Sequence, residues 1–93
     1  QIALDNDGNL QNCNIVDETI KIFKNINAIL NEVNMTFKNI VKSTIFLKNM
    51  DDFSSVNTIY AKHFKSNPPA RETIEVSRLP KNVNIEISVI AVK

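Results

Sequence analysis

Residues 84–92 read NIEISVIAV, a pattern typical of a β-strand whose two faces differ. One face carries Ile85, Ile87, Val89 and Ala91, and the other carries Glu86, Ser88, Ile90 and Val92. Another strand is predicted just before it, over Thr73–Leu79, and Pro80-Lys81-Asn82 joins the two. If these two strands pair with each other, they form an antiparallel unit at the end of the chain.

Two segments further upstream have apolar residues at helical spacing. Asn14 is expected to cap the first helix and Asn34 to end it. Its apolar stripe covers about half of the circumference and consists of Val16, Ile20, Ile22, Phe23, Ile26, Ile29, Leu30 and Val33. The second helix begins at Asp51 or Asp52, and Asn67-Pro68-Pro69 must end it. Its apolar side carries Phe53, Val56, Ile59, Tyr60 and Phe64.

The order of these elements predicts the fold class. Ile40–Lys48 (IVKSTIFLK) is rich in β-branched and aromatic residues and is expected to form a strand between the two helices. Ile2–Leu4 is a short apolar piece ahead of a turn cluster around Gly8. Strand, helix, strand, helix, strand, strand predicts an α+β sandwich of two helices on one sheet, as a single domain over residues 1–93. Three full strands are few for two strongly apolar helices, which indicates missing strands, an oligomer, or both.

Composition excludes several classes of function. Eleven Lys plus Arg against ten Asp plus Glu give a net charge of +1, and the lysines are scattered, which disfavours binding to nucleic acid phosphates. No apolar run approaches the roughly twenty residues of a membrane span. Cys13 is the single cysteine and His63 the single histidine, so a disulfide framework and a zinc site are not expected. A reducing, cytoplasmic setting is the natural expectation.

Arg71 and Glu86 are the two residues whose side-chain type and position in the sequence indicate a possible function. The chain has nine lysines and two arginines, so an arginine directly after Pro-Pro-Ala indicates that a planar, two-pronged donor is needed to bind a carboxylate. Glu86 lies within an Ile- and Val-rich strand, where an ionised carboxylate needs a partner. On composition alone the non-functional alternative is favoured: the two residues form a structural ion pair, or Glu86 lies on an open sheet face. Arg78, His63 and Cys13 are interpreted as residues without a catalytic role.

The closing segment PPARETIEVSRLPKNVNIEISVIAVK resembles the carboxy-terminal signature of the RidA (YjgF-like) family. That signature runs Pro-Ala-Arg, a short strand, Leu-Pro, and a strand with a central Glu. The segment NIVKSTIFLKNMDDFSSVNTIYAKHF is similar to the strand-and-helix region of the same family, and Gln1-Ile2 is similar to the residues after its Ser-Gly pair. The resemblance implies a chorismate-mutase-like fold and a homotrimer with sites between subunits. Relative to the family, the chain lacks about thirty amino-terminal residues, a tyrosine and a serine of the pocket among them.

The resemblance also implies roles for individual residues. Arg71 matches the arginine that grips the substrate carboxylate, and Glu86 matches the glutamate that activates the attacking water. Asn57 matches an asparagine of the substrate site. Thr73 stands where many members have cysteine, so its hydroxyl can only form hydrogen bonds, and Pro68 replaces a frequent aromatic residue.

The implied activity is hydrolytic deamination of reactive 2-imino acids. The expected substrates are enamine/imine tautomers such as 2-iminopropanoate and 2-iminobutanoate, and the products are 2-oxo acids and ammonia. No cofactor or metal is expected to take part, because an imine carbon is already electrophilic and the site mainly positions a water. Nucleic acid and membrane partners are not expected either, because the lysines are scattered and the apolar runs are short. Two alternatives stay open: a non-catalytic ligand-binding or chaperone-like trimer, and an endoribonuclease or translation inhibitor.

Overall fold

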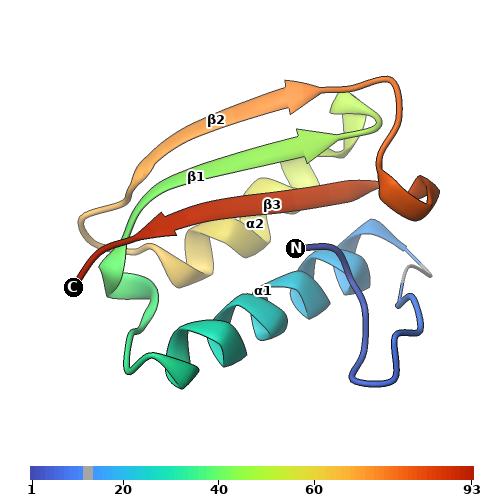
Figure 1. Cartoon of the computed structure of the whole chain (residues 1–93). Helices are drawn as coiled ribbons and strands as arrows, with labels where there is room; N and C mark the ends of the chain where they lie inside the picture. Colours follow the sequence, from blue (N-terminus) through green and yellow to red (C-terminus); the bar gives the residue numbers. More distant parts are fainter. Residues whose placement is uncertain (12–13) are drawn as a thin grey trace.

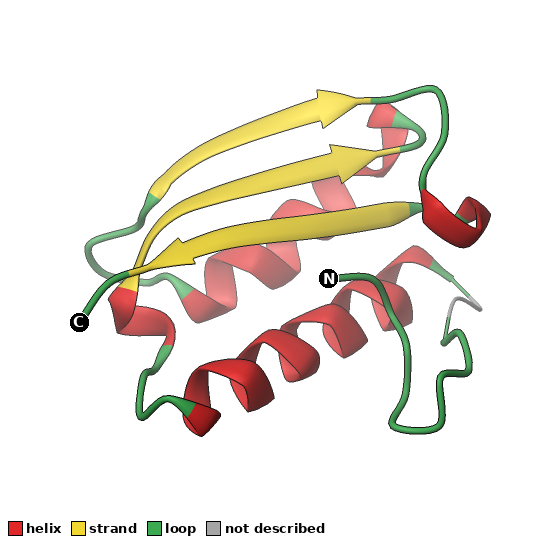
Figure 2. Cartoon of the chain, in the orientation of Figure 1, coloured by secondary structure: helices red, strands yellow, loops and turns green. Residues whose placement is uncertain are grey.

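The computed structural model describes residues 1–11 and 14–93, and it contains two helices on one face of a three-stranded sheet (Figures 1 and 2). The helices are α1 (Ile15–Glu32) and α2 (Phe53–His63), and the strands are β1 (Ile40–Leu47), β2 (Ala70–Glu75) and β3 (Ile85–Ala91). Short 3₁₀ helices lie at Phe37–Asn39, Met50–Asp52 and Pro80–Asn82. The α+β sandwich predicted from the sequence is confirmed.

Helix α1 begins and ends where its capping residues predict. The side chain of Asn14 accepts a hydrogen bond from the backbone N–H of Asp17 at 2.8 Å, and Asn34 has a φ of 60° just past the last turn. Half of the apolar stripe is buried, at Ile22, Phe23, Ile26 and Leu30. The other half, Val16, Ile20, Ile29 and Val33, is exposed. The three-stranded sheet therefore covers half of the stripe, which agrees with the expectation that three strands are few for two strongly apolar helices.

The sheet has the order β2-β1-β3, with β1 parallel to β2 and antiparallel to β3. The last two strands therefore do not pair with each other, and the antiparallel unit considered from the sequence is wrong. The parallel pair arises because α2 crosses over between β1 and β2, as parallel neighbours require. Residues 76–84, including the 3₁₀ helix Pro80–Asn82, then carry the chain across to the far side of β1.

The bounds of β2 also differ from the expected Thr73–Leu79. The strand runs from Ala70 to Glu75, and its register pairs Ala70 with Lys42 and Glu75 with Leu47. It starts directly after Pro69, because a proline fixes the extended geometry that leads into an edge strand. It ends at Glu75, the register partner of the last β1 residue Leu47, whose carbonyl accepts one more hydrogen bond from the N–H of Val76 at 2.8 Å.

The two faces of the sheet are different, and the residues predicted to share a face in 84–92 do lie on the same face. The helix-covered face forms the core with Ile45 and Leu47 of β1 and with Ile85 and Ile87 of β3, all of them buried. The opposite face carries Thr44, Phe46, Glu72, Ile74, Glu86, Ser88 and Ile90, and no helix covers it (Figure 2).

A buried carboxylate fixes the start of β3. Glu18 of α1 is fully buried, and its side chain accepts hydrogen bonds from the backbone N–H groups of Asn84 (3.0 Å) and Ile85 (3.3 Å). It also accepts one from the side-chain amide of Asn84 at 2.9 Å. Three donors satisfy the carboxylate where water cannot reach it. At the free edge of β3, Gln1 and Ile87 exchange two backbone hydrogen bonds, of 2.7 and 3.0 Å.

Candidate functional site

Arg71, the second residue of β2, is held by three side chains of α2. Its Nη1 donates a hydrogen bond to Oδ1 of Asn57 at 2.5 Å. Its Cζ lies 4.8 Å from the ring centroid of Tyr60 and 5.6 Å from that of Phe53, within cation–π range of both rings. The guanidinium therefore lies on the helix-bearing side of the sheet edge. It is oriented by an amide and two rings, and among the described residues four of its five N–H donors are left for other partners.

Three unpaired hydroxyls belong to residues that neighbour Arg71 on the helix-bearing face of the sheet and on α2. Ser43 of β1 lies directly opposite Arg71 in the register, Thr73 lies two residues further along the same face of β2, and the ring of Tyr60 lies against the guanidinium. The hydroxyl oxygens of all three are buried and have no hydrogen-bond partner among the residues that the structure describes. Buried polar atoms are normally paired, so unpaired ones beside a cation are typical of a site that receives a ligand or ordered water.

Glu86 does not share this site within one chain. It lies on β3, in register with Phe46, and the central strand β1 separates it from β2. It also lies on the helix-free face of the sheet, whereas Arg71 lies on the helix-bearing face. The structure brings Arg71, Asn57 and Thr73 together and leaves Glu86 on the opposite face and the opposite edge strand.

The remaining residues singled out from the sequence lie apart from Arg71 or at its margin. Arg78 is exposed in the loop after β2, and Pro68 is exposed in the loop before it. His63, interpreted as a surface or boundary residue, is exposed but stacks on the ring of Phe23, with centroids 4.5 Å apart. Burial, and to a smaller extent the charge of Lys62, lowers the pKa of His63. Cys13 lies outside the described residues.

Phe53, Tyr60 and Ser43 are members of the site that the sequence did not reveal. Phe53 and Tyr60 were assigned to the apolar side of the second helix. The spacing of Phe53, Asn57 and Tyr60 (i, i+4, i+7) nevertheless places an amide between two rings on one helix face. That pattern is the signal that could have predicted a cradle for a cation.

The described residues contain neither a recognisable metal site nor a membrane span. No group of three or more His, Cys, Asp and Glu side chains among them could hold a metal ion. No helix in the described part of the chain is long and apolar enough to cross a membrane.

Proteins of one family resemble this chain in sequence. A profile of the family described as Endoribonuclease L-PSP matches residues 1–93. The RutC family protein PH0854 of Pyrococcus horikoshii is 43% identical over 94 residues, which cover 100% of this chain and 75% of that protein. A human protein named 2-iminobutanoate/2-iminopropanoate deaminase is 39% identical over 94 residues, which cover 100% of this chain and 69% of the human one.

Solved structures resemble the fold equally closely. The crystal structure of yeast Mmf1 superposes with a TM-score of 0.96 at 40% identity, and the match covers 100% of this chain and 74% of that one. The structure of the YjgF gene product of E. coli superposes with a TM-score of 0.87 at 34% identity, covering 100% and 76%. The chain spans 64% of SSO3206, a Saccharolobus solfataricus relative 46% identical over 86% of this chain.

These matches define the class of protein as one with the chorismate-mutase-like α+β fold of two helices on a mixed sheet. The chain belongs to the RidA (YjgF-like) family, whose profile carries the description Endoribonuclease L-PSP.

Proposed function

We propose that this chain is the catalytic part of a deaminase that hydrolyses reactive 2-imino acids to 2-oxo acids and ammonia. The observation that carries the proposal is the guanidinium of Arg71, oriented by Asn57 and with donors to spare, two residues before the unpaired hydroxyl of Thr73 on the same face of β2. A carboxylate fits such a planar fork through two parallel hydrogen bonds. The name of the human relative, a 2-iminobutanoate/2-iminopropanoate deaminase, supports the same substrate class.

Arg71 and Glu86 divide the proposed reaction between them. Arg71 binds the substrate carboxylate, Asn57 positions Arg71, and Thr73 offers its hydroxyl to the substrate. The oxygen of a water forms a bond to the imine carbon, while Glu86 takes a proton from that water and returns it to the imine nitrogen. Glu86 then moves the hydroxyl proton of this adduct to the nitrogen. The C–N bond breaks, the carbonyl forms, and ammonia leaves with Glu86 ionised again.

The proposal requires a second copy of the chain. Because Glu86 and Arg71 of one chain lie on opposite faces of the sheet, the Glu86 that acts on a given substrate belongs to a neighbouring subunit. A homotrimer with its sites between subunits fits this requirement. Two features support it: the helix-free face of the sheet exposes Ile74 and Ile90, and β2 is an edge strand with Arg71 at its start.

The decisive test mixes two inactive variants, Arg71→Ala and Glu86→Ala. Activity is followed as the lifetime of 2-aminoacrylate, generated from serine by a dehydratase and trapped with semicarbazide. Each variant alone should be inactive, with circular dichroism showing that it is folded. Trimers formed from an equal mixture should regain about a quarter of the wild-type rate, because one in four random neighbour pairs combines an intact Arg71 with an intact Glu86.

Two results would contradict the proposal. Normal activity of a folded Arg71→Ala variant would show that Arg71 does not bind the substrate carboxylate. An absence of rescue on mixing would show that the site is not shared between subunits. Both the 93-residue chain and any longer product of its gene are to be measured, since the chain spans part of its relatives. Tight binding of a 2-oxo acid without imine hydrolysis in either form would instead favour a non-catalytic ligand-binding trimer.

A further inference from the structure

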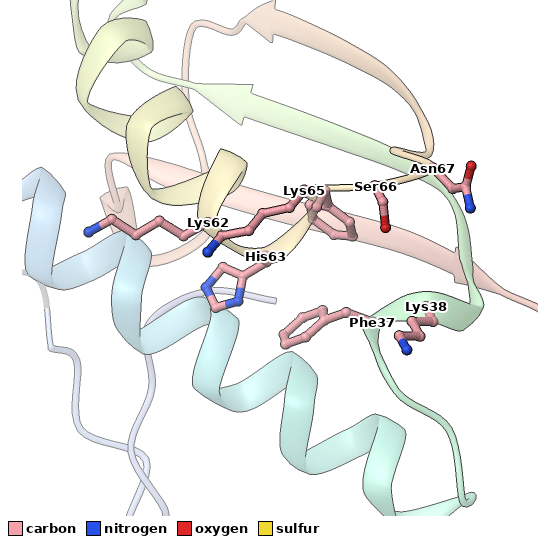
Figure 3. Close-up of a pocket in the computed structure, with 8 residues that line it drawn as sticks. Phe37, Lys38, Lys62, His63, Lys65, Ser66 and Asn67 are labelled. Carbon is pink, nitrogen blue, oxygen red and sulfur yellow. The ribbon is translucent and has the colours of Figure 1, made fainter.

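A second concave site lies at the end of α2 away from Phe53. It is a cavity of about 390 Å³ lined by two segments, residues 37–38 and 62–67 (Figure 3). None of these residues contacts the guanidinium of Arg71, which is held by Asn57, Phe53 and Tyr60. The cavity is therefore separate from the proposed active site. Its volume falls within the roughly 300–1,000 Å³ that small-molecule sites occupy.

The charge of this cavity is one-sided. Its lining includes Lys38, Lys62 and Lys65 and contains no aspartate or glutamate. Among the described residues the ion pair within 4.0 Å joins Lys42 to Glu72, and it involves none of these three lysines. The C-terminal end of α2 supplies about half a negative charge through its free carbonyl groups. Three ammonium groups exceed that charge several-fold, so the cavity keeps a net positive potential.

The walls of the cavity carry stacked rings and polar groups suited to an anion. His63 is stacked on Phe23 with ring centroids 4.5 Å apart, and Phe37 lies 4.8 Å from His63 on the cavity side. In Figure 3 the rings of His63 and Phe37 lie between the ammonium groups of Lys65 and Lys38, while that of Lys62 points away from them. Ser66 and Asn67 add a hydroxyl and an amide to the lining.

We propose that this cavity is a binding site for a small phosphorylated molecule, whose phosphate is attracted by the positive charge of Lys38 and Lys65. A phosphate ester carries about 1.5–2 negative charges near pH 7, more than a single carboxylate, and so matches several ammonium groups. Lysine binds phosphate as a point charge and needs no fixed bidentate geometry. The apolar rings of Phe37 and His63 form a surface against which the carbon part of such a ligand packs. Lys62 strengthens the potential without touching the phosphate.

The single histidine provides a direct readout of this site. In the free protein the pKa of His63 is lowered, first by burial and second by the charge of Lys62. The groups that line the cavity around it are cationic, namely Lys38 from the 3₁₀ helix Phe37–Asn39 and Lys65 from the loop after α2; from α1 it meets the ring of Phe23. A bound dianion stabilises the imidazolium, so binding should raise the pKa of His63, which is measurable from its imidazole carbon-bound protons by NMR.

The experiment titrates the folded chain with glycerol 3-phosphate, inorganic phosphate and, as a neutral control, glycerol, all at constant ionic strength. Both phosphates should bind saturably, with shifts at Phe37, His63 and Lys65 and a raised His63 pKa, and glycerol should not. The double variant Lys38→Gln/Lys65→Gln should bind glycerol 3-phosphate at least tenfold more weakly. The matched control Lys24→Gln/Lys93→Gln has the same net charge and should bind it normally.

Three results would overturn the proposal. The first is shifts that never saturate, and the second is an equal loss of binding in the two double variants, which would indicate unspecific attraction. The third is saturable binding of single-stranded RNA through Lys38 and Lys65 without binding of either small phosphate, which would make this surface a nucleic-acid interface. None of these measurements uses the imine reaction, so the two proposals fail independently.

Discussion

The two cationic regions of this molecule are constructed in opposite ways. Arg71 is oriented by the amide of Asn57 and by the rings of Tyr60 and Phe53, so its direction is set before any ligand arrives. The lysines of the cavity at the end of α2 have no ion-pair partner among the described residues, and each keeps a flexible four-carbon stem. In the proposed roles, the first arrangement selects one planar anion through geometry. The second attracts any compact anion of sufficient charge, and its selectivity comes from the cavity walls.

Replacing arginine by lysine in the Arg71 site, and lysine by arginine in the cavity, should affect function to very different extents in the two regions. Arg71→Lys removes the bidentate fork and the stacking on Tyr60, and we expect a loss of roughly 10²–10³ in kcat/KM for 2-aminoacrylate hydrolysis, about 3–4 kcal/mol. In the cavity, Lys65→Arg keeps the charge and should change the affinity for glycerol 3-phosphate less than about threefold. Steady-state kinetics and NMR titration measure the two effects. Equal tolerance at both positions would contradict the distinction between a geometric and an electrostatic site.

The sequence predicts the faces of the strands better than it predicts their neighbours. The alternation at Ile85, Glu86 and Ile87 is set by the pleat of a single strand, and the structure confirms it. The bounds of β2 depend on the length of β1, which is information from another part of the chain, and there the prediction was wrong. The order of the strands in the sheet also depends on distant parts of the chain. This order places Arg71 against α2 and Glu86 away from it, and no local sequence pattern predicts it.

The site shows the same division between local and distant information. The unusual arginine at position 71 was identified from residue choice alone, because the chain otherwise prefers lysine. Its ring partners Phe53 and Tyr60 were missed, since their spacing also fits an ordinary apolar helix face, whereas Asn57 was named through the family resemblance. Ser43 was not identified either. A serine in a buried strand indicates a role in the site only once its neighbour across the sheet is known to be Arg71.

The contribution of the Tyr60 ring can be separated from that of its hydroxyl. Tyr60→Phe keeps the ring under Arg71 and removes a buried hydroxyl that has no described partner, so we expect wild-type KM and unchanged or slightly higher stability. Tyr60→Leu removes the ring and should raise KM about tenfold, or about 1–2 kcal/mol, through loss of the cation–π contact. Kinetics on variants shown by thermal unfolding to be folded give both values. A tenfold defect in Tyr60→Phe would mean that the hydroxyl, and not the ring, positions Arg71 or binds the ligand.

The smallest expected effect concerns His63 and the pH dependence of stability. Burial lowers the pKa of His63 in the folded chain, so between its folded and unfolded pKa values the unfolded chain binds more protons. The associated stability is complete above the unfolded value of about 6.5 and is lost as pH falls through the lowered folded pKa. His63→Phe keeps an aromatic ring against Phe23 and should reduce the decline in unfolding free energy between pH 7 and pH 5, measured by urea denaturation. Saturating glycerol 3-phosphate should flatten the wild-type curve in the same way, because it raises the folded pKa toward the unfolded one. A wild-type curve that stays parallel to that of His63→Phe would show that His63 keeps its ordinary pKa in the folded chain, and the cationic cavity would then exert no measurable field on its own histidine.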